Sequence, residues 1–315
     1  MTIDIRPVEP GDLPRLAEVF AAAFAAHGHT VVTTVEELAE EFQPPHCDPR
    51  TDAVVAVENG RIIGGAHTIF KPSTEREVRC YLEGKVDPAS TGRGAGSALL
   101  DWSLGRAFEL LSAETALPRV SRVKVLEDDL ALPSLLSARG FRAVRWFSTL
   151  LRPLGDAPEA GDPEGIRIAP WDPARSVDAL GVNNVAFADH WGSAPMQPEG
   201  WTQNTTGFGS HPATSFMAFD DDRVVAFLTS HRYDVDDEAI GKTIGWVDHL
   251  GTLPTHRRRG IASALITRAL GAYRAEGWTH AAIEVDNDNP TGARGLYGSL
   301  GFAPWRGSVT WERRL

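Results

Sequence analysis

The sequence predicts a layered α/β protein that contains two tandem copies of one domain. Two apolar, strand-like runs, 78–86 and 244–253, each lead into a glycine turn that opens an amphipathic helix. The turns, at Gly94 and Gly260, stand about half of the 315-residue chain apart. Because a strand, a tight turn and a helix recur in the same order, the pattern indicates a duplicated domain.

Shorter similarities extend the repeat on both sides of the glycine turns. The matching pairs are 22–27 with 185–190, 60–64 with 222–226, and 140–141 with 301–302. Their offset is almost constant. The order of the elements is therefore kept between the halves, and only the loop lengths differ.

Each half is expected to begin with a short strand and a helix, followed by two strands joined at a polar turn. Asn59-Gly60 is a strong hairpin signal, and the three aspartates that start at Asp220 are a weaker one. A third strand enters the glycine turn and its helix, and a buried strand, a last helix and terminal strands close the unit. The expected ranges are 3–6, 13–26, 53–58, 62–70, 78–86, 94–111 and 120–126 in the first half, and 166–169, 176–187, 215–219, 224–231, 244–253, 260–275 and 280–285 in the second.

A segment rich in proline, glycine and acidic residues separates the two halves. This composition is typical of a linker between folded units. We therefore expect an N-terminal domain at 1–152, a linker at 153–164 and a C-terminal domain at 165–315.

The composition is that of an ordinary globular protein, with 42% apolar and 23% charged residues. No run of about 18 apolar residues occurs and the first residues lack signal-peptide features, so we expect no membrane partner and a cytoplasmic location. The net charge of −11 argues against a nucleic-acid partner. The two cysteines, Cys47 and Cys80, are expected to be free thiols. The oligomeric state is not fixed by these features.

The turn around Gly260 has the properties of a diphosphate-binding site. The first backbone N–H groups of a helix have no partner inside the helix and carry the positive end of its dipole. Gly260 and Ala262 leave room for a phosphate, and three arginines, Arg257 to Arg259, add positive charge. A dinucleotide-binding loop of the G-x-G-x-x-G type is the main rival, but the earlier turn continues as Ser97-Ala98-Leu99 without the third glycine.

These motifs resemble the GNAT superfamily of acyl-CoA-dependent N-acetyltransferases. Arg257, Gly260 and Ala262 fill the family pattern R/Q-x-x-G-x-G/A, and 284–302 resembles the family ending N-x-x-A…Y-x-x-x-G-F. The tandem layout and the stretch 182–188 resemble the mycothiol synthases of this family. The resemblance implies two domains, each with a mixed, mostly antiparallel sheet flanked by helices. It also implies acetyl-CoA as cosubstrate and direct acetyl transfer to a primary amine of a small acceptor.

The resemblance further implies where acetyl-CoA lies in the second half. Backbone groups of Leu250 and Thr252 would line the pantetheine, because the strand that carries them parts from its neighbour there. Tyr297 falls on the family's tyrosine near the thioester sulfur, where a phenol can donate a proton to the leaving thiolate. Asn289 would either cap the last helix or contact the cofactor. The turn residues expected to bind the cofactor are Arg257, Arg258, Arg259, Gly260, Ile261, Ala262 and Ser263.

The proton acceptor is not given by the family pattern, because Trp246 stands where many members have a glutamate. Asp248 lies two residues further along the strand, so strand alternation puts it on the same face as Trp246. We expect Asp248 to act as the base or to be a structural polar residue, with Glu284 on the next strand as the reserve candidate. His249 is expected on the opposite face.

The wall of the acceptor pocket is expected to contain His190, Trp191 and Trp246. Trp201 is a further candidate for the wall. Ordinary aromatic packing is an equally good explanation for His190, Trp191 and Trp201. No metal site is expected, since the histidines lack ligand spacing.

The first half departs from the family pattern and is expected to be degenerate. Thr91 replaces the family's Arg or Gln, and Leu136 occupies the tyrosine position. Arg93, Gly94 and Gly96 keep the turn, so this half either binds acyl-CoA or only supports the fold. Two alternative functions stay open for the whole protein: a non-catalytic acyl-CoA-binding regulator, and a transferase for protein lysines or N-termini.

Overall fold

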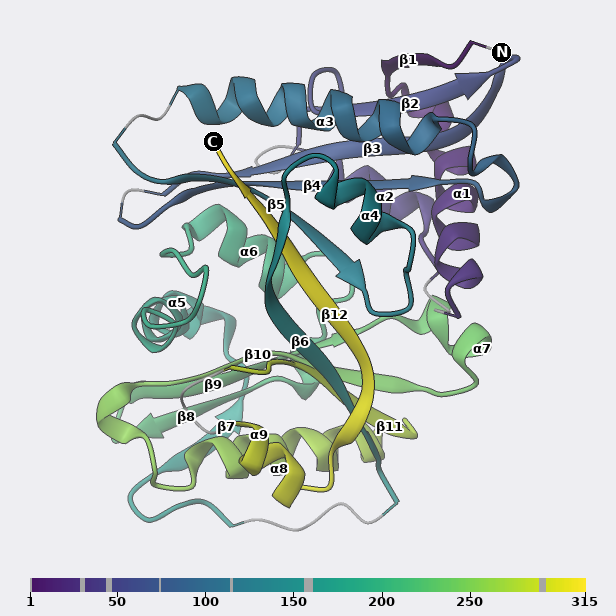
Figure 1. Cartoon of the computed structure of the whole chain (residues 1–315). Helices are drawn as coiled ribbons and strands as arrows, with labels where there is room; N and C mark the ends of the chain where they lie inside the picture. The colour runs from purple at the N-terminus through teal and green to yellow at the C-terminus, as the bar shows by residue number, and fades with distance from the viewer. Residues whose placement is uncertain are drawn as a thin grey trace. The chain divides into compact units, whose positions relative to one another are not determined.

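A computed structural model describes residues 2–28, 32–43, 47–73, 75–113, 116–155, 161–288 and 293–315. The chain forms two compact units (Figure 1). Unit 1 contains Met1–Arg145 and Ser308–Leu315, and unit 2 contains Trp146–Gly307. Both units are mixed α/β structures with a mostly antiparallel sheet, as the sequence predicts.

Unit 1 is built on a sheet in which five strands follow the order β1-β2-β3-β4-β5. All neighbours are antiparallel except β4 and β5, which run parallel. Its elements are β1 (Asp4–Pro7), α1 (Leu13–Ala26), α2 (Val35–Glu41), β2 (Ala53–Glu58), β3 (Arg61–Lys71), β4 (Val78–Val86), α3 (Ala95–Ser112), β5 (Arg119–Leu126) and α4 (Leu132–Ser137), with short 3₁₀ helices at Pro10–Asp12 and Pro88–Ser90.

Unit 2 repeats this order, with β10 and β11 as its parallel pair. Its elements are β6 (Arg142–Pro153, from Trp146 on), β7 (Arg167–Pro170), α5 (Ser176–Ala186), α6 (Pro198–Thr206), β8 (Phe216–Asp220), β9 (Arg223–Arg232), α7 (Asp237–Ile240), β10 (Ile244–Thr252), α8 (Ile261–Ala275), β11 (His280–Asp286), α9 (Ala293–Ser299) and the start of β12 (Ala303–Arg314), with 3₁₀ helices at Pro173–Arg175, Pro212–Thr214, Asp234–Asp236 and Pro254–His256.

The last strands of the two sequence halves cross between the units. From Phe147 to Pro153, β6 pairs with β11, so the end of the first half completes the sheet of unit 2. From Ser308 to Arg314, β12 pairs with β5 in unit 1. The compact units therefore differ from the expected domains 1–152 and 165–315 in these two strands, because strand pairing between distant segments leaves no local signal in the sequence.

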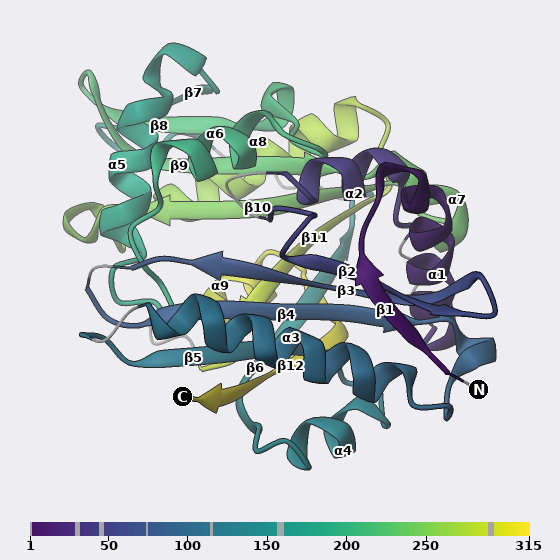
Figure 2. The same ribbon diagram turned by 90° about the horizontal axis from the view of Figure 1, so that it is seen from above.

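Helices cover both faces of the unit 1 sheet, and two adjacent glycines of β3 show which helix lies on which face. A Cβ atom at Gly64 would lie 3.0 Å from Leu99 of α3, whereas one at Gly65 would lie 2.5 Å from Leu16 of α1. Since successive strand residues point to opposite faces, α3 and α1 lie on opposite sides. Figure 2 shows α3 running along the sheet beside β4.

Two glycines of β10 in unit 2 also face different helices, which shows that this strand is irregular. A Cβ atom at Gly245 would approach Tyr273 of α8 at 2.7 Å, and one at Gly251 would approach Ala186 of α5 at 3.4 Å. These glycines are an even number of positions apart and would share a face in a regular strand. A register shift between Val247 and His249 reverses the alternation, so Asp248 is the extra residue of a β-bulge.

None of the described helices is both long and apolar enough to cross a membrane.

Candidate active site

The parallel strands of each unit part at equivalent positions. In unit 2 the pairing of β10 with β11 ends at Val247 and Ile283. In unit 1 the pairing of β4 with β5 ends at Tyr81 and Arg122. The later residues of β10, including Leu250 and Thr252, keep their pairing with β9 alone. This parting, expected from the sequence, leaves one edge of β10 available to an extended ligand.

The bulge brings Asp248 and His249 to the same face of the sheet. Oδ2 of Asp248 lies 2.6 Å from Nδ1 of His249. Asp248 also faces His231, the cross-strand partner of Trp246, so it lies on the face of Trp246, where the sequence predicts it. The expectation that His249 points to the opposite face is wrong, because it assumed regular alternation and the bulge interrupts it.

Asp248 is held by Asn204 and His231, which come from two other elements of unit 2 and also contact each other. Asn204 of α6 donates its side-chain N–H to Oδ2 of Asp248 at 2.8 Å. Nδ1 of His231 lies 3.1 Å from Oδ1 of Asp248, and Nε2 of His231 donates to the carbonyl of Asn204 at 3.0 Å. Sequence reasoning missed His231 and Asn204, because a strand histidine and a helix asparagine carry no motif.

The pKa values in this cluster follow from these contacts. Burial opposes the charge on Asp248, but hydrogen bonds from His231 and His249 outweigh it and hold its pKa well below the usual range. Burial also opposes the charge on His231, yet the hydrogen bond to Asp248 raises its pKa overall. With a carbonyl at one nitrogen and a carboxylate at the other, His231 can donate from both as an imidazolium. The buried His231 and the more exposed Asp248 thus form a carboxylate–imidazole pair.

The glycine turns of the two units have the same backbone shape. In unit 2, Arg258 (φ 65°) and Gly260 (φ 81°) are left-handed and α8 begins at Ile261. In unit 1, Gly92 (φ 75°) and Gly94 (φ 96°) take these places before α3. Alternating left-handed residues turn successive N–H groups into one concave surface that suits an anion. Ala262 and Ser263 follow in the first turn of α8, whose N-terminus adds its free N–H groups.

The three arginines of this turn differ in what they contact. Arg257 donates to the carbonyl of Ala186 at 2.9 Å and so ties the end of α5 to the end of β10. Arg259 donates to the carbonyl of Glu164 at 3.0 Å and lies 3.6 Å from Asp220. Arg258 is exposed. Arg257 and Arg259 therefore shape the turn, although Arg259 is exposed as Arg258 is.

Tyr297 lies in α9, with only 7% of its surface exposed. Its ring packs edge-on against Phe302 at 6.1 Å between centroids, and burial raises its pKa to about 12. The phenol therefore keeps its proton at neutral pH. Asn289 lies outside the described residues. Glu284 is exposed on β11, where its Cα partner is Thr149 of β6.

The aromatic residues expected at the acceptor wall separate into two groups. Trp201 is buried, donates to the carbonyl of Ser176 at 3.0 Å and packs against Phe227, so it belongs to the core. Trp246 is half-buried on the face that carries Asp248. His190 and Trp191 make ring contacts with Phe187 at 5.4 Å and Phe147 at 6.4 Å, respectively.

Unit 1 contains a cavity of about 580 Å³ at its glycine turn. The cavity is lined by Gly92, Gly94, Gly96, residues 82–86 of β4 and apolar side chains of α4. Arg93, expected to bind the cofactor, pairs with Glu58 at 2.9 Å. Leu136 is buried where unit 2 has its tyrosine.

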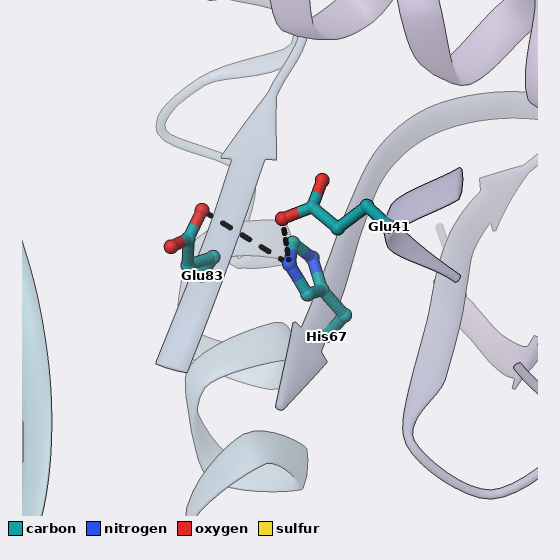
Figure 3. Close-up of side chains that lie close together, drawn as sticks. All are labelled: Glu41, His67 and Glu83. Carbon is teal, nitrogen blue, oxygen red and sulfur yellow. Dashed lines mark hydrogen bonds and ion pairs between the residues drawn. The ribbon is translucent and has the colours of Figure 1, made fainter. Parts of the chain in front are cut away.

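Unit 1 also holds a cluster of side chains that could ligate a metal ion (Figure 3). Nε2 of His67 lies 3.0 Å from Glu41 and 4.0 Å from Glu83, and the three ligand atoms are within 4.8 Å of one another. Burial opposes a charge on His67, but the glutamates raise its pKa overall. A hydrogen bond between His67 and Glu41 holds two of the three side chains together. The three residues come from α2, β3 and β4, so their spacing in the sequence does not predict the cluster.

Comparison with known proteins gives the same architecture. The family model described as Acetyltransferase (GNAT) family matches 16–130 and again 182–302. A mycothiol acetyltransferase of Thermomonospora curvata is 30% identical over 302 residues, covering 95% of this chain and 94% of the relative. One from Thermobispora bispora is 32% identical over 72% of this chain and 74% of its own length.

Two solved structures share the fold. A GCN5-related N-acetyltransferase from Sphaerobacter thermophilus superposes with a TM-score of 0.78 at 23% identity, covering 99% of this chain and 95% of the other. A tandem GNAT protein from the clavulanic acid biosynthesis pathway gives 0.74 at 15% identity, covering 99% and 98%.

Proposed function

Because this chain belongs to the GNAT family of acetyltransferases, we propose that its unit 2 moves an acetyl group from acetyl-CoA to a primary amine of a small acceptor. The observation that carries this proposal is the pairing of Asp248 with His249 beside the point where β10 leaves β11. This pairing supports a proton acceptor beside the open strand edge. Acetyl transfer needs both.

The diphosphate of acetyl-CoA is proposed to bind the backbone N–H groups from Arg258 to Ser263. The left-handed residues Arg258 and Gly260 and the free start of α8 support this position. Arg258 adds charge, while Arg257 and Arg259 keep the turn in shape. The pantetheine then runs along Leu250 and Thr252, and Thr252 contributes a buried hydroxyl with no hydrogen-bond partner among the described residues.

In the transfer step the amine nitrogen attacks the thioester carbonyl, the C–N bond forms and the C–S bond breaks. The amine must first be uncharged, so a proton has to be accepted near Asp248. Both oxygens of Asp248 are already engaged, Oδ1 beside His231 and Oδ2 by His249 and Asn204. We therefore assign proton acceptance to Nε2 of His249, whose other nitrogen is held by Asp248. Glu284 stays the alternative base on the facing strand.

Tyr297 is proposed to donate a proton or hydrogen bond to the departing thiolate. Its raised pKa of about 12 supports a role as hydrogen-bond donor, since the phenol stays protonated across the working range. Coenzyme A then leaves as a thiolate that this hydrogen bond stabilises, since a thiol titrates near about 8.5, and the proton accepted by His249 passes to solvent.

The relatives are named mycothiol acetyltransferases. A cysteinyl pseudo-disaccharide is therefore the first acceptor to test on this chain. The half-buried Trp246 is expected at the acceptor side, where many family members have a glutamate. This residue would therefore make the acceptor of this chain differ from that of the relatives. Thiol release from acetyl-CoA, measured against a panel of amino sugars, polyamines, amino acids and cysteinyl pseudo-disaccharides, tests the proposal. Amine-dependent release supports it. Acetyl-CoA binding without release for any amine would instead support a non-catalytic acyl-CoA-binding regulator.

A protein acceptor is the third outcome of the same experiment. Release that depends on a lysine-containing or free N-terminal peptide, and on none of the small amines, would make this chain a protein N-acetyltransferase. The proposed small acceptor would then be abandoned while the roles of Asp248, His249 and Tyr297 would remain.

A further inference from the structure

The cavity of unit 1 contains a lysine in unusual surroundings. Lys85 of β4 is half-buried and lines the cavity, and its ammonium lies 4.6 Å above the ring of Phe24 in α1. Among the residues that the structure describes, no carboxylate lies within 4.0 Å of it. Burial lowers the pKa of Lys85 against the weaker opposing effect of Glu83 and Asp129. A larger fraction of this amine is therefore uncharged than for an exposed lysine.

Lys85 lies on the part of β4 that has parted from β5. Parallel pairing ends at Tyr81, four residues earlier, and the same cavity continues to Gly92, Gly94 and Gly96 at the start of α3. A chain that begins on this turn and follows the free strand edge would pass Lys85. The cavity thus holds an anion-binding turn at one end and an amine along its wall.

Comparison of the two units shows what is particular to unit 1. Lys85 precedes Gly94 by the same number of residues as Gly251 precedes Gly260, and each faces the first helix of its unit. A Cβ atom at Gly251 would lie 2.7 Å from Phe227, so unit 2 has no room for a side chain there. Unit 1 therefore carries a primary amine at a position where the ring of Phe227 excludes any side chain in unit 2.

We propose that Lys85 is itself an acyl acceptor, modified by a coenzyme A thioester bound on the Gly92–Gly96 turn of unit 1. The proposal shares with the proposed function the idea that such a turn binds the diphosphate of coenzyme A, but it does not need catalysis by unit 2. Unit 1 then performs one transfer to its own side chain instead of repeated turnover.

The step is balanced without any further reactant. The uncharged Nζ attacks the thioester carbonyl, an amide C–N bond forms, the C–S bond breaks and coenzyme A leaves as a thiolate. The proton lost by Nζ ends on that thiolate. Leu136 stands where unit 2 has Tyr297, so no phenol assists departure, and we expect the reaction to be slower than transfer in unit 2.

Acylation would change the cavity in two ways. The positive charge and its contact with the Phe24 ring are lost, and an amide with its acyl group occupies the space along β4. A second thioester could no longer lie in the same position. The modified cavity would therefore be closed to further acyl-CoA.

The chain offers its own controls, because it contains only four lysines: Lys71, Lys85, Lys124 and Lys242. Burial lowers the pKa of Lys71 as well, but Lys71 does not line the cavity. Lys71 thus reports intrinsic amine reactivity alone. The full-length protein, freed of acyl groups by a deacetylase, is incubated with acetyl-CoA, and each lysine is followed by peptide mass spectrometry.

We expect Lys85 to gain an acetyl group at least ten times faster than each of the other three lysines, with a rate that saturates in acetyl-CoA. Gly96→Glu should abolish this preference, because it puts a carboxylate at the anion-binding turn and its Cβ makes only ordinary contacts, at 3.8 Å and beyond. Gly105→Glu, later in the same helix and with open space around it, is the matched control and should leave labelling unchanged.

Equal rates at Lys85 and Lys71, or unchanged labelling in Gly96→Glu, would overturn the proposal. Amine-dependent turnover is measured in parallel on Lys85→Arg, which leaves unit 2 intact. Lys85 labelling without turnover would refute only the proposed function of unit 2. Turnover without Lys85 labelling would refute only the inference about unit 1.

Discussion

Oδ2 of Asp248 lies 2.6 Å from Nδ1 of His249, although the two residues are neighbours in one strand. Neighbouring strand residues normally point to opposite faces of a sheet. The bulge between Val247 and His249 removes this separation and builds a carboxylate–imidazole pair from consecutive residues. His231 and Asn204 hold the carboxylate from the other side. Asp248 therefore orients the ring of His249, and His231 and Asn204 in turn orient Asp248.

This arrangement predicts a coupled loss of activity. Asp248→Asn and His249→Gln should each lower kcat by about 10²- to 10⁴-fold, the range of general acid–base catalysis. The double variant should lose no more than the worse single variant, because the two residues act as one unit. Steady-state thiol release measures all three. Glu284→Gln is the comparison, and a larger loss there than in His249→Gln would move the base to β11.

Tyr297→Phe should lower kcat by about 10²-fold or more while leaving the KM for acetyl-CoA unchanged. The ring and its packing on Phe302 remain, so only the donor is lost. Tyr273→Phe is the matched control. Tyr273 is fully buried and its hydroxyl bonds Ser230 and the carbonyl of Trp246, so this variant should lose about 1 kcal/mol of stability and keep its kcat. Equal kcat values for the two variants would count against Tyr297 as donor.

The glycine turn of unit 2 can be tested with two alanine substitutions in or beside α8. Gly260 has φ 81°, so Gly260→Ala should cost about 1 kcal/mol of stability and weaken acetyl-CoA binding. Gly271→Ala, inside the helix and with open space around it, should gain about 0.5–1 kcal/mol without affecting binding. Chemical denaturation and calorimetry measure the two quantities. Acetyl-CoA binding as tight in Gly260→Ala as in the unsubstituted protein would contradict the proposal that this turn binds the diphosphate.

The ion pair of His67 predicts a pH dependence of stability in unit 1. The pKa of His67 is raised above its ordinary value in the folded state, so the contribution is fully present below about pH 6.5 and is lost as the pH rises through the folded pKa. Glu41→Gln should therefore destabilise the protein by about 1–3 kcal/mol at pH 6 and by much less at pH 9. Denaturation at the two pH values checks this, and a penalty that grows with pH would show that the sign is wrong.

The features that sequence reasoning found are local ones. The turns at Gly94 and Gly260, the repeat and the position of Tyr297 follow from residues close together in the chain, where spacing and turn chemistry act. Several structural features needed contacts between distant segments. These are the exchange of β6 and β12, the bulge at Asp248, and the roles of His231 and Asn204. The bulge changed the site most, because it reversed the expected face of His249.

The unit 1 cavity shows a second limit of pattern matching. Leu136 and Thr91 stand where the family pattern has a tyrosine and an arginine or glutamine, and these two differences indicate a degenerate domain. The same pattern does not report that the turn keeps its left-handed residues or that a cavity with Lys85 remains beside it. A sequence motif shows that a catalytic residue is missing, whereas a cavity depends on how distant side chains pack.

One comparison tests most directly the claim that unit 2 binds acetyl-CoA on its own turn and transfers the acetyl group there. Ala262 and Gly96 occupy matching places in α8 and α3, and Ala262→Glu and Gly96→Glu each put a carboxylate where the diphosphate is proposed to bind. Amine-dependent thiol release from acetyl-CoA should disappear in Ala262→Glu and persist in Gly96→Glu. Release that persists in Ala262→Glu and disappears in Gly96→Glu would contradict the account.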